Sequence, residues 1–348
     1  MSFLTYLHKV VSRENLTAAE AQTAMQLILD GETSTTVISA FLVAERMKGE
    51  TPDELLGFAR AIRSRAVTIR PGAPGEPLVD TCGTGGDGAC TFNISTVAAF
   101  VTAGAGVKVA KHGNRSISSQ CGSADILEAL GVEIQLAPEA VCECIRETGI
   151  GFLFAPYLHP AMKHAQPARV ELKMRTVFNL LGPLTNPAAA TAQVLGAPSV
   201  RAAELMAEAL AALGLPRGFV VHGLDGLDEI TTTRETLMLE IRSGAIAHRT
   251  VTPEDFGLPV ARPEDLKGDD RETNARIARS LLAGEAGPKR DVVLANASAA
   301  LVAAGKAANF REGVSLAAQS IDSGAAARVL QRMAAWTTAS RGRLAVSP

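Results

Sequence analysis

The fold is indicated by the stretch Pro77-Leu-Val-Asp-Thr-Cys-Gly-Thr-Gly-Gly-Asp-Gly88. Its first half predicts a short strand over Pro77–Cys82, its glycines predict a turn, and an apolar helix is expected over Ser95–Ala103. The same order follows at once, with a strand over Val107–Ala110, a polar turn and a helix over Ala124–Leu130. Repeated strand–turn–helix units favour a mostly parallel sheet.

Later segments extend this pattern. A strand is expected over Phe219–His222, after a helix over Arg201–Leu213. Two alanine-rich stretches, Asn296–Gly305 and Ala317–Met333, predict helices that pack closely on the sheet. From residue 71 onward we therefore expect an α/β domain with a mostly parallel central sheet.

The first seventy residues contain helix signals and no alternating strand pattern. Thr17-Ala-Ala-Glu20 forms a capping box, and Thr51-Pro-Asp-Glu54 begins another helix with proline at its first position. Three prolines and two glycines in Arg70–Pro77 then predict a linker or hinge. We expect a small all-helical domain over residues 1–70, to which 166–187 returns, and a larger α/β domain over 71–165 and 188–348.

Composition limits the class of protein. The chain has 348 residues and a formal net charge of −2, whereas a dedicated nucleic-acid binder usually has a basic surplus. Its five cysteines include no C-x-x-C pair, which argues against a disulfide framework or structural zinc site. No signal peptide is evident, and the apolar stretch Val97–Val107 is too short to cross a bilayer. We expect a cytoplasmic protein.

The glycine-rich turn Gly83–Gly88 fits the pattern G-x-G-x-x-G, which is weak when it stands alone. The simpler interpretation is a tight turn between a strand and a helix. A dinucleotide site would require an acid about twenty residues later, yet none occurs between Asp87 and Asp125. Because Lys108, Lys111 and Arg115 fall in this gap, a heavily phosphorylated ligand is favoured over NAD.

The second loop, Lys111-His-Gly-Asn-Arg-Ser-Ile-Ser-Ser119, contains two cations and three hydroxyls, which are good donors to phosphate oxygens. Ser123 is expected to cap the helix that follows. A solvated polar loop is the simpler alternative. However, the two loops leave neighbouring strands, and ligands of open α/β sheets bind in the crevice between such loops.

Two adjacent acids, Asp228 and Glu229, follow the strand Phe219–His222. Magnesium is commonly bound by one or two carboxylates together with substrate phosphates and water. A solvated acidic turn is the alternative. The position after a strand of the same sheet favours a metal site.

Several blocks together resemble the anthranilate phosphoribosyltransferase family and follow one another in the family's order over roughly residues 1–335. They are Asp80–Asp87, Thr91–Thr96, Lys111–Ser119, Gly122–Gly131, Phe152–Pro156, His159–Lys163, Arg175–Pro187 and His222–Glu229. The resemblance implies an enzyme of tryptophan biosynthesis that transfers the phosphoribosyl group of phosphoribosyl pyrophosphate (PRPP) to anthranilate. The products are N-(5-phosphoribosyl)anthranilate and pyrophosphate. The related alternatives are a pyrimidine nucleoside phosphorylase and a non-catalytic nucleic-acid-binding relative.

The resemblance also implies roles for residues at matching positions. Lys111 stabilises charge, no residue acts as a general acid or base, and one or two Mg²⁺ ions are bound by Ser95, Asp228 and Glu229. Anthranilate contacts Gly83, Asn114 and Arg169, and the acceptor pocket includes His112, Tyr157, His159 and Met162. The residues expected to bind PRPP are Gly83, Gly86, Asp87, Thr91, Asn93, Ile94, Ser95, Thr96, Lys111, His112, Gly113, Asn114, Arg115, Ser116, Ile117, Ser118, Ser119 and Ser123. A homodimer through the helical domain is expected as well.

Overall fold

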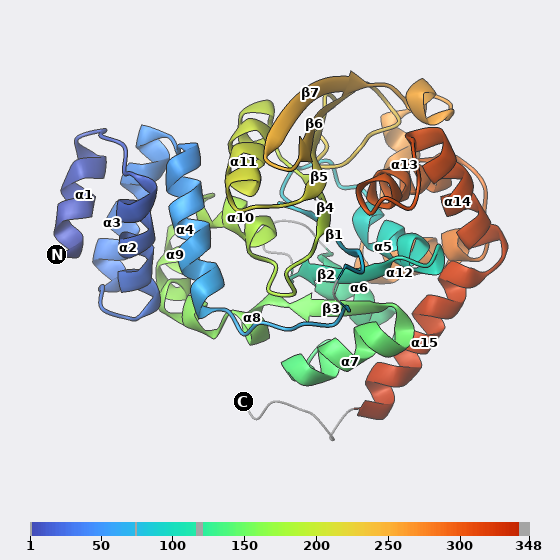
Figure 1. Ribbon diagram of the computed structural model, residues 1–348, viewed down its shortest axis with the longest axis horizontal. Helices are drawn as coiled ribbons and strands as arrows, with labels where there is room; N and C mark the ends of the chain where they lie inside the picture. Colours follow the sequence, from blue (N-terminus) through green and yellow to red (C-terminus); the bar gives the residue numbers. More distant parts are fainter. Residues whose placement is uncertain (1, 74, 116–120, 341–348) are drawn as a thin grey trace.

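The structure is a computed structural model that describes residues 2–73, 75–115 and 121–340. The chain begins with a helical unit, followed by a larger unit in which helices surround one sheet (Figure 1). No helix within the described residues is long and apolar enough to cross a membrane.

The N-terminal unit consists of helices throughout, as predicted. They are α1 (Phe3–Val11), α2 (Ala18–Leu29), α3 (Thr35–Lys48) and α4 (Pro52–Arg65). Capping boxes begin α2 at Thr17 and α4 at Thr51. Each threonine hydroxyl accepts from the N–H of the glutamate three residues later, and that glutamate's carboxylate accepts from the threonine N–H. In the core, the ring of Phe41 meets Phe3 and Phe58 edge-on, with ring centroids 5.2 and 6.1 Å apart.

A later segment packs onto this unit. It contains α9 (Gln166–Leu172), α10 (Phe178–Leu181) and the 3₁₀ turn η2 (Gly182–Thr185). Helix α9 packs against α3, whereas α10 and η2 pack against α4. Ala168, Phe178 and Leu184 are buried in the same core as Phe41 and Phe58. The division at residues 70, 165 and 187 that we predict from the sequence remains our proposal.

The described strands form one seven-stranded sheet in the order β3-β2-β1-β4-β5-β6-β7. The first five strands of this order are parallel, and β6 and β7 continue the sheet antiparallel. The predicted fold class is therefore confirmed. The strands are β1 (Leu78–Gly83), β2 (Lys108–Gly113), β3 (Ile150–Phe154), β4 (Ala192–Gly196), β5 (Arg217–Gly223), β6 (Thr236–Arg242) and β7 (Ala245–Val251).

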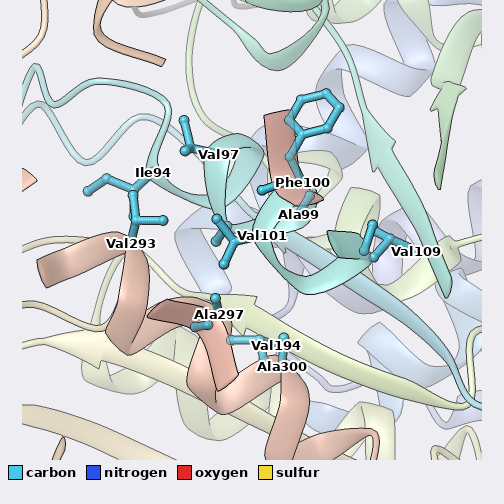
Figure 2. Close-up of a cluster of buried hydrophobic side chains, with 14 of the residues drawn as sticks. Ile94, Val97, Ala99, Phe100, Val101, Val109, Val194, Val293, Ala297 and Ala300 are labelled. Atoms are coloured by element: carbon cyan, nitrogen blue, oxygen red, sulfur yellow. The ribbon is translucent and has the colours of Figure 1, made fainter. Parts of the chain in front are cut away.

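Alternate side chains of the central strands enter two separate cores, because successive residues of a strand point to opposite faces. Val194 and Val221 pack with α5 (Ile94–Gly104) and α13 (Pro288–Ala303), the pair of helices seen in Figure 2. Leu195 and Val220 pack with α11 (Val200–Ala212) and the helical unit on the other face. The sheet is thus covered on both faces, as its parallel strands require.

The other helices are α6 (Ser123–Ala129), α7 (Pro138–Thr148), α8 (Ala155–Leu158), α12 (Arg271–Leu282), α14 (Phe310–Asp322) and α15 (Ala325–Ser340). Further 3₁₀ turns are η1 (Pro160–His164), η3 (Pro253–Phe256) and η4 (Pro263–Leu266).

Two helix predictions need correction. The helical stretch predicted over Ala317–Met333 is interrupted at Gly324, whose positive φ of 72° ends α14 before α15 begins. Helix α15 packs against α5 and α7 more than against the sheet. Ser123 is the first residue of α6. The N-cap is Gly122, whose N–H donates to the Asp125 carboxylate. Ser123 therefore does not cap this helix.

Candidate active site

The topology of the sheet points to one place for a ligand. Strand β1 lies between β2 and β4. The chain continues from β1 to β2 on one side and from β4 to β5 on the other side. Ligands of open α/β sheets bind outside the carboxyl ends of the strands where the strand order reverses in this way. The glycine loop Gly83–Gly88 begins at the end of β1, at this point of reversal.

Asp228 lies at this place. Its Oδ2 accepts a 2.6 Å hydrogen bond from the Gly85 N–H, which joins the glycine loop to the loop after β5. A Cβ added to Gly83 would lie 2.5 Å from Asp228 Oδ2, and one added to Gly196 would lie 1.6 Å from the Asp228 carbonyl oxygen. The glycines that end β1 and β4 therefore leave the room that Asp228 occupies.

Glu229 reaches the beginning of α5. Its Oε1 accepts a 3.2 Å hydrogen bond from the Ser95 N–H in the first turn of the helix. Asn93, the N-cap residue, makes no side-chain capping bond there, so the Glu229 carboxylate supplies an acceptor at the positive end of the helix. The structure thus brings Ser95 and Glu229 together across 134 positions of the sequence.

If both were ionised, the carboxylates of Asp228 and Glu229 would carry more negative charge than the nearby Lys111 balances. Burial, together with the charge of Glu229, raises the pKa of Asp228 well above its ordinary value. Burial also raises the pKa of Glu229 to about 7, although Lys111 opposes this shift. The Glu229 carboxylate, which is bonded to Ser95, and the neighbouring Asp228 carboxylate are hard oxygen donors, and a divalent cation would relieve their repulsion. This donor set fits magnesium.

Lys111 lies in β2, which continues to Gly113, so the first three residues of the predicted second loop belong to the strand. Its side chain is buried, its ammonium group donates to the Thr81 carbonyl, and the Ser95 hydroxyl lies 3.4 Å away. Burial lowers the pKa of Lys111, and the neighbouring Asp80 opposes this shift. A cation is therefore placed beside Ser95, at the edge of the sheet where the glycine loop begins.

Two other described residues of the second loop, Asn114 and Arg115, contact residues of α6. Arg115 forms ion pairs with Asp125 at 3.0 Å and Glu128 at 2.7 Å, so its guanidinium is engaged by α6. The Ser123 hydroxyl donates to the Asn114 carbonyl at 3.3 Å, and Gly113 leaves room for that hydroxyl. The predicted ligands Ser116, Ile117, Ser118 and Ser119 lie outside the described residues.

The other residues assigned to PRPP lie along the first loop and α5. Gly86 has a positive φ, and Asp87 Oδ1 accepts from the Ala89 N–H at 3.1 Å. Thr91 forms an isolated bridge with Lys267, and Asn93 donates to the Cys121 carbonyl at 3.0 Å. The side chain of Ile94 packs toward Val293 in the core (Figure 2), and Thr96 is buried. Ile94 can therefore offer a ligand mainly its backbone.

Two neutral histidines lie beside each other next to this crevice. The rings of His112 and His159 are 5.2 Å apart, and burial lowers their pKa values to about 3 and about 4. His112 Nδ1 lies 3.1 Å from the Gly182 carbonyl, which can only accept, so the ring proton is assigned to Nδ1. Nε2 is then an acceptor, and it is buried without a hydrogen-bond partner in the described part of the chain.

Arg169 lies on α9 with its guanidinium 5.2 Å from the centre of the Phe178 ring. Burial lowers its pKa. Of the other residues assigned to the acceptor pocket, Tyr157 bonds Gln135 at 3.3 Å, whereas Met162 packs against the core of the helical unit. The returning segment connects Arg169 with the histidines. It contains Phe178, which contacts Arg169, and Gly182, whose carbonyl contacts His112.

Known proteins share both units of this chain. A profile described as "Glycosyl transferase family, helical bundle domain" matches residues 4–66, and one described as "Glycosyl transferase family, a/b domain" matches residues 75–327. The chain is 64% identical to an anthranilate phosphoribosyltransferase of Solibacter usitatus, over 96% of this chain and 98% of that protein. This chain belongs to the anthranilate phosphoribosyltransferase family.

Further members of the anthranilate phosphoribosyltransferase family agree with this assignment. The protein of Symbiobacterium thermophilum is 54% identical over 95% of this chain and 96% of its own length. The crystal structure of the Thermus thermophilus enzyme matches with a TM-score of 0.89 and 48% identity, over 95% of this chain and 99% of that one. The Saccharomyces cerevisiae enzyme in complex with PRPP and Mg matches with a TM-score of 0.88 and 29% identity, over 97% and 98%.

Sequence reasoning misses that the backbone pairing of β1 with β2 ends early. Their pairing ends at Val79 opposite Val109, and side chains then take over the backbone bonds of β2. Asp80 Oδ1 accepts from the His112 N–H at 3.1 Å, and Asn186 donates to the Ala110 carbonyl at 2.9 Å. The backbone pairing of the two strands thus stops before the end of the sheet where the glycine loop and the second loop begin. Polar residues within an apolar strand, such as Asp80, are the signal that could have indicated this.

Proposed function

We propose that this chain transfers the phosphoribosyl group from PRPP to anthranilate, giving N-(5-phosphoribosyl)anthranilate and pyrophosphate in tryptophan biosynthesis. The observation that supports this most directly is the meeting of three elements at one point of the sheet. Asp228 touches the glycine loop after β1, and Glu229 touches the first turn of α5 beside Lys111. This arrangement suits a phosphorylated sugar that is bound together with a metal ion.

Magnesium is the cofactor, and we assign its protein ligands to Ser95, Asp228 and Glu229. When bound, it neutralises charge on the pyrophosphate group. Asp228 is buried and Glu229 is half-buried, and burial and then the charge of Glu229 raise the pKa of Asp228. Few protein ligands are needed, because magnesium usually completes its coordination with substrate phosphates and water.

We assign PRPP to the crevice between the two loops. Gly83, Gly86 and Asp87 would face its diphosphate, and Asn93–Thr96 would offer the positive end of α5. Lys111 would stabilise the charge that grows on pyrophosphate as its bond to ribose C1 breaks. Thr91 and the described residues His112–Arg115 and Ser123 would complete the site. Arg115 would first have to leave its ion pairs with Asp125 and Glu128.

We assign anthranilate to the side of the crevice near Gly83, Asn114 and Arg169. The planar guanidinium of Arg169 matches a carboxylate, and its stacking on Phe178 fixes its orientation. The aromatic amine is neutral at pH 7, so its lone pair can attack ribose C1 without a general base. A C–N bond forms, the C–O bond to pyrophosphate breaks, and the nitrogen releases one proton. Orientation and charge stabilisation supply the rate.

We further propose a cytoplasmic homodimer that assembles through the helical unit. A groove of about 420 Å³ runs between α1, α3 and α9, and its lining includes Val11, Met47 and Leu172. Val11 and Met47 are exposed by 62% and 70%, which is unusual for apolar side chains so close together. Light scattering should give the mass of a dimer, and Met47→Glu should give that of a monomer. A monomeric native protein would contradict this proposal.

Product analysis tests the proposed reaction against its two alternatives. With PRPP, anthranilate and Mg²⁺, mass spectrometry should find N-(5-phosphoribosyl)anthranilate and pyrophosphate in equal amounts. Phosphate-dependent cleavage of thymidine would instead indicate a nucleoside phosphorylase. Salt-sensitive DNA binding without turnover would indicate a nucleic-acid-binding protein. The similar proteins of Solibacter usitatus and Thermus thermophilus favour neither alternative.

A further inference from the structure

Arg175 holds the glycine loop from the side of the returning segment. Its Nη1 donates to the Gly86 carbonyl at 2.5 Å, and its Nη2 donates to the Gly85 carbonyl at 3.1 Å. Arg175 lies between α9 and α10, so these two bonds join the glycine loop to a segment about ninety positions later in the chain. Hydrogen bonds from a charged donor to two successive carbonyls fix a loop more firmly than one neutral bond would.

The two bonds determine where the loop's N–H groups point. In a planar trans peptide the carbonyl and the following N–H point in opposite directions. Because Arg175 binds the carbonyls of Gly85 and Gly86, the N–H groups of Gly86 and Asp87 are directed away from the guanidinium. Gly85 and Gly86 have φ values of 66° and 72°, so the loop is irregular and depends on such contacts for its conformation.

Gly85 is bound on both sides. Its N–H donates to Asp228 at 2.6 Å, while its carbonyl accepts from Arg175. The loop is therefore fixed between the candidate metal ligand and the returning segment. Arg169, our candidate for the anthranilate carboxylate, lies on that same segment in α9, and the chain turns at Lys173 (φ 46°) before it reaches Arg175.

We infer that Arg175 is a positioning residue that presents the N–H groups of the glycine loop to the pyrophosphate group of PRPP. It acts through backbone carbonyls and need not touch either substrate. The inference rests on the proposed function, because it assumes that this loop binds PRPP.

The test compares steady-state kinetics of the full-length enzyme with Arg175→Met and Arg175→Lys. Methionine keeps the apolar part of the side chain and removes both donors, whereas lysine can restore one. We expect kcat/KM for PRPP to fall about tenfold to a hundredfold in Arg175→Met and to recover in part in Arg175→Lys. The KM for anthranilate and the Tm should stay close to those of the native enzyme.

A matched control is Arg332→Met. Arg332 also donates from its guanidinium to a backbone carbonyl, that of Thr148, but it lies on α15, outside both loops. We expect native kinetics for this control. Unchanged PRPP kinetics in Arg175→Met would overturn the inference, and so would a higher affinity for PRPP, which would mean that the bonds hold the loop away from substrate.

Two further results decide the role of Arg175. Equal losses for both substrates with a lower Tm would indicate a purely structural role for Arg175 and would also overturn the inference. If the native enzyme itself shows no turnover, the proposed function fails. Titration of native and Arg175→Met protein with magnesium pyrophosphate then tests the inference, which predicts weaker binding by the variant. Equal binding by the two proteins would overturn it.

Discussion

Asp228 and Gly85 are joined by a 2.6 Å hydrogen bond between the carboxylate of one and the backbone N–H of the other. This bond connects the loop after β5 with the loop after β1 across 143 positions of the sequence. The carboxylate that we propose as a metal ligand is thereby placed in direct contact with the glycine loop. The consequences of this contact can be measured in variants of the chain.

The first prediction concerns the two carboxylates. The double variant Asp228→Asn and Glu229→Gln keeps the shape of both side chains and removes their charge. We expect turnover at saturating substrates to fall by about 10²–10³-fold or more, because the site loses the charges that hold the metal. Anthranilate affinity, measured by fluorescence titration, should change little. Glu272→Gln, at an exposed acid of α12, is the control, and undiminished turnover of the double variant would refute the metal assignment.

The second prediction concerns the space beside Asp228. A Cβ at Gly196 would overlap the Asp228 backbone at 1.6 Å, and backbone cannot move aside as a flexible side chain can. We expect Gly196→Ala to lower the free energy of unfolding by about 3 kcal/mol and to reduce turnover. Gly72→Ala is the matched control, because an added Cβ there lies 3.7 Å from its nearest neighbour. If thermal melting finds both variants equally stable, the close packing of Asp228 against β4 is wrong.

The third prediction concerns pH. The pKa of Glu229 rises to about 7 in the folded protein from an ordinary value of 4.5. The folded state therefore favours the protonated form, and this contribution to stability is lost as pH rises from 4.5 toward 7. Magnesium competes with this proton and with that of Asp228, whose pKa is also raised. Its affinity should therefore increase with pH, and the Glu229 proton should contribute up to about tenfold per unit below about pH 7.

The increase in Tm caused by Mg²⁺ with pyrophosphate, measured across the range from acidic to mildly alkaline pH, tests this linkage. Glu229→Gln is the control, because it has no titrating group at this position. A magnesium affinity with the same pH dependence in the native protein and in Glu229→Gln would contradict the assignment of the proton to Glu229.

The fourth prediction concerns Arg169. A lysine cannot reproduce the planar, two-pronged hydrogen bonding of a guanidinium to a carboxylate, nor its stacking on Phe178. We therefore expect Arg169→Lys to raise the KM for anthranilate about tenfold or more, with a much smaller effect on the KM for PRPP. Arg146→Lys, at a guanidinium that donates to the carbonyls of Arg70 and Pro71, is the control. An unchanged KM for anthranilate would remove Arg169 from the site.

Local pattern was sufficient to predict much of the fold. The capping boxes at Thr17 and Thr51 mark helices because their bonding partners lie only three residues away. The strand before the glycine loop is predicted over Pro77–Cys82 and observed over Leu78–Gly83, because Leu78 and Val79 mark its start and the glycine-rich turn marks its end. The parallel strands β3 and β4 and the antiparallel strands β6 and β7 are absent from the predictions, because their pairing depends on neighbours that the local pattern does not reveal.

The sequence proposes members of the site but cannot predict their contacts. Loop composition and resemblance pointed to Ser95, Asp228 and Glu229, yet only the folded chain brings Glu229 to the N–H of Ser95. The same applies to Asp80, whose carboxylate replaces a strand-to-strand bond at His112, and to Arg115, whose charge is engaged by Asp125 and Glu128. Such choices among possible partners are made by tertiary packing.

The rate at which anthranilate fluorescence disappears tests the central claim most directly. We predict that the signal falls only when enzyme, PRPP and Mg²⁺ are all present, and that pyrophosphate appears in equal amount. Omission of any one component should abolish the change. A stable signal with folded enzyme and active substrates, or a loss that continues without PRPP, would contradict the assignment of this chain as the transferase.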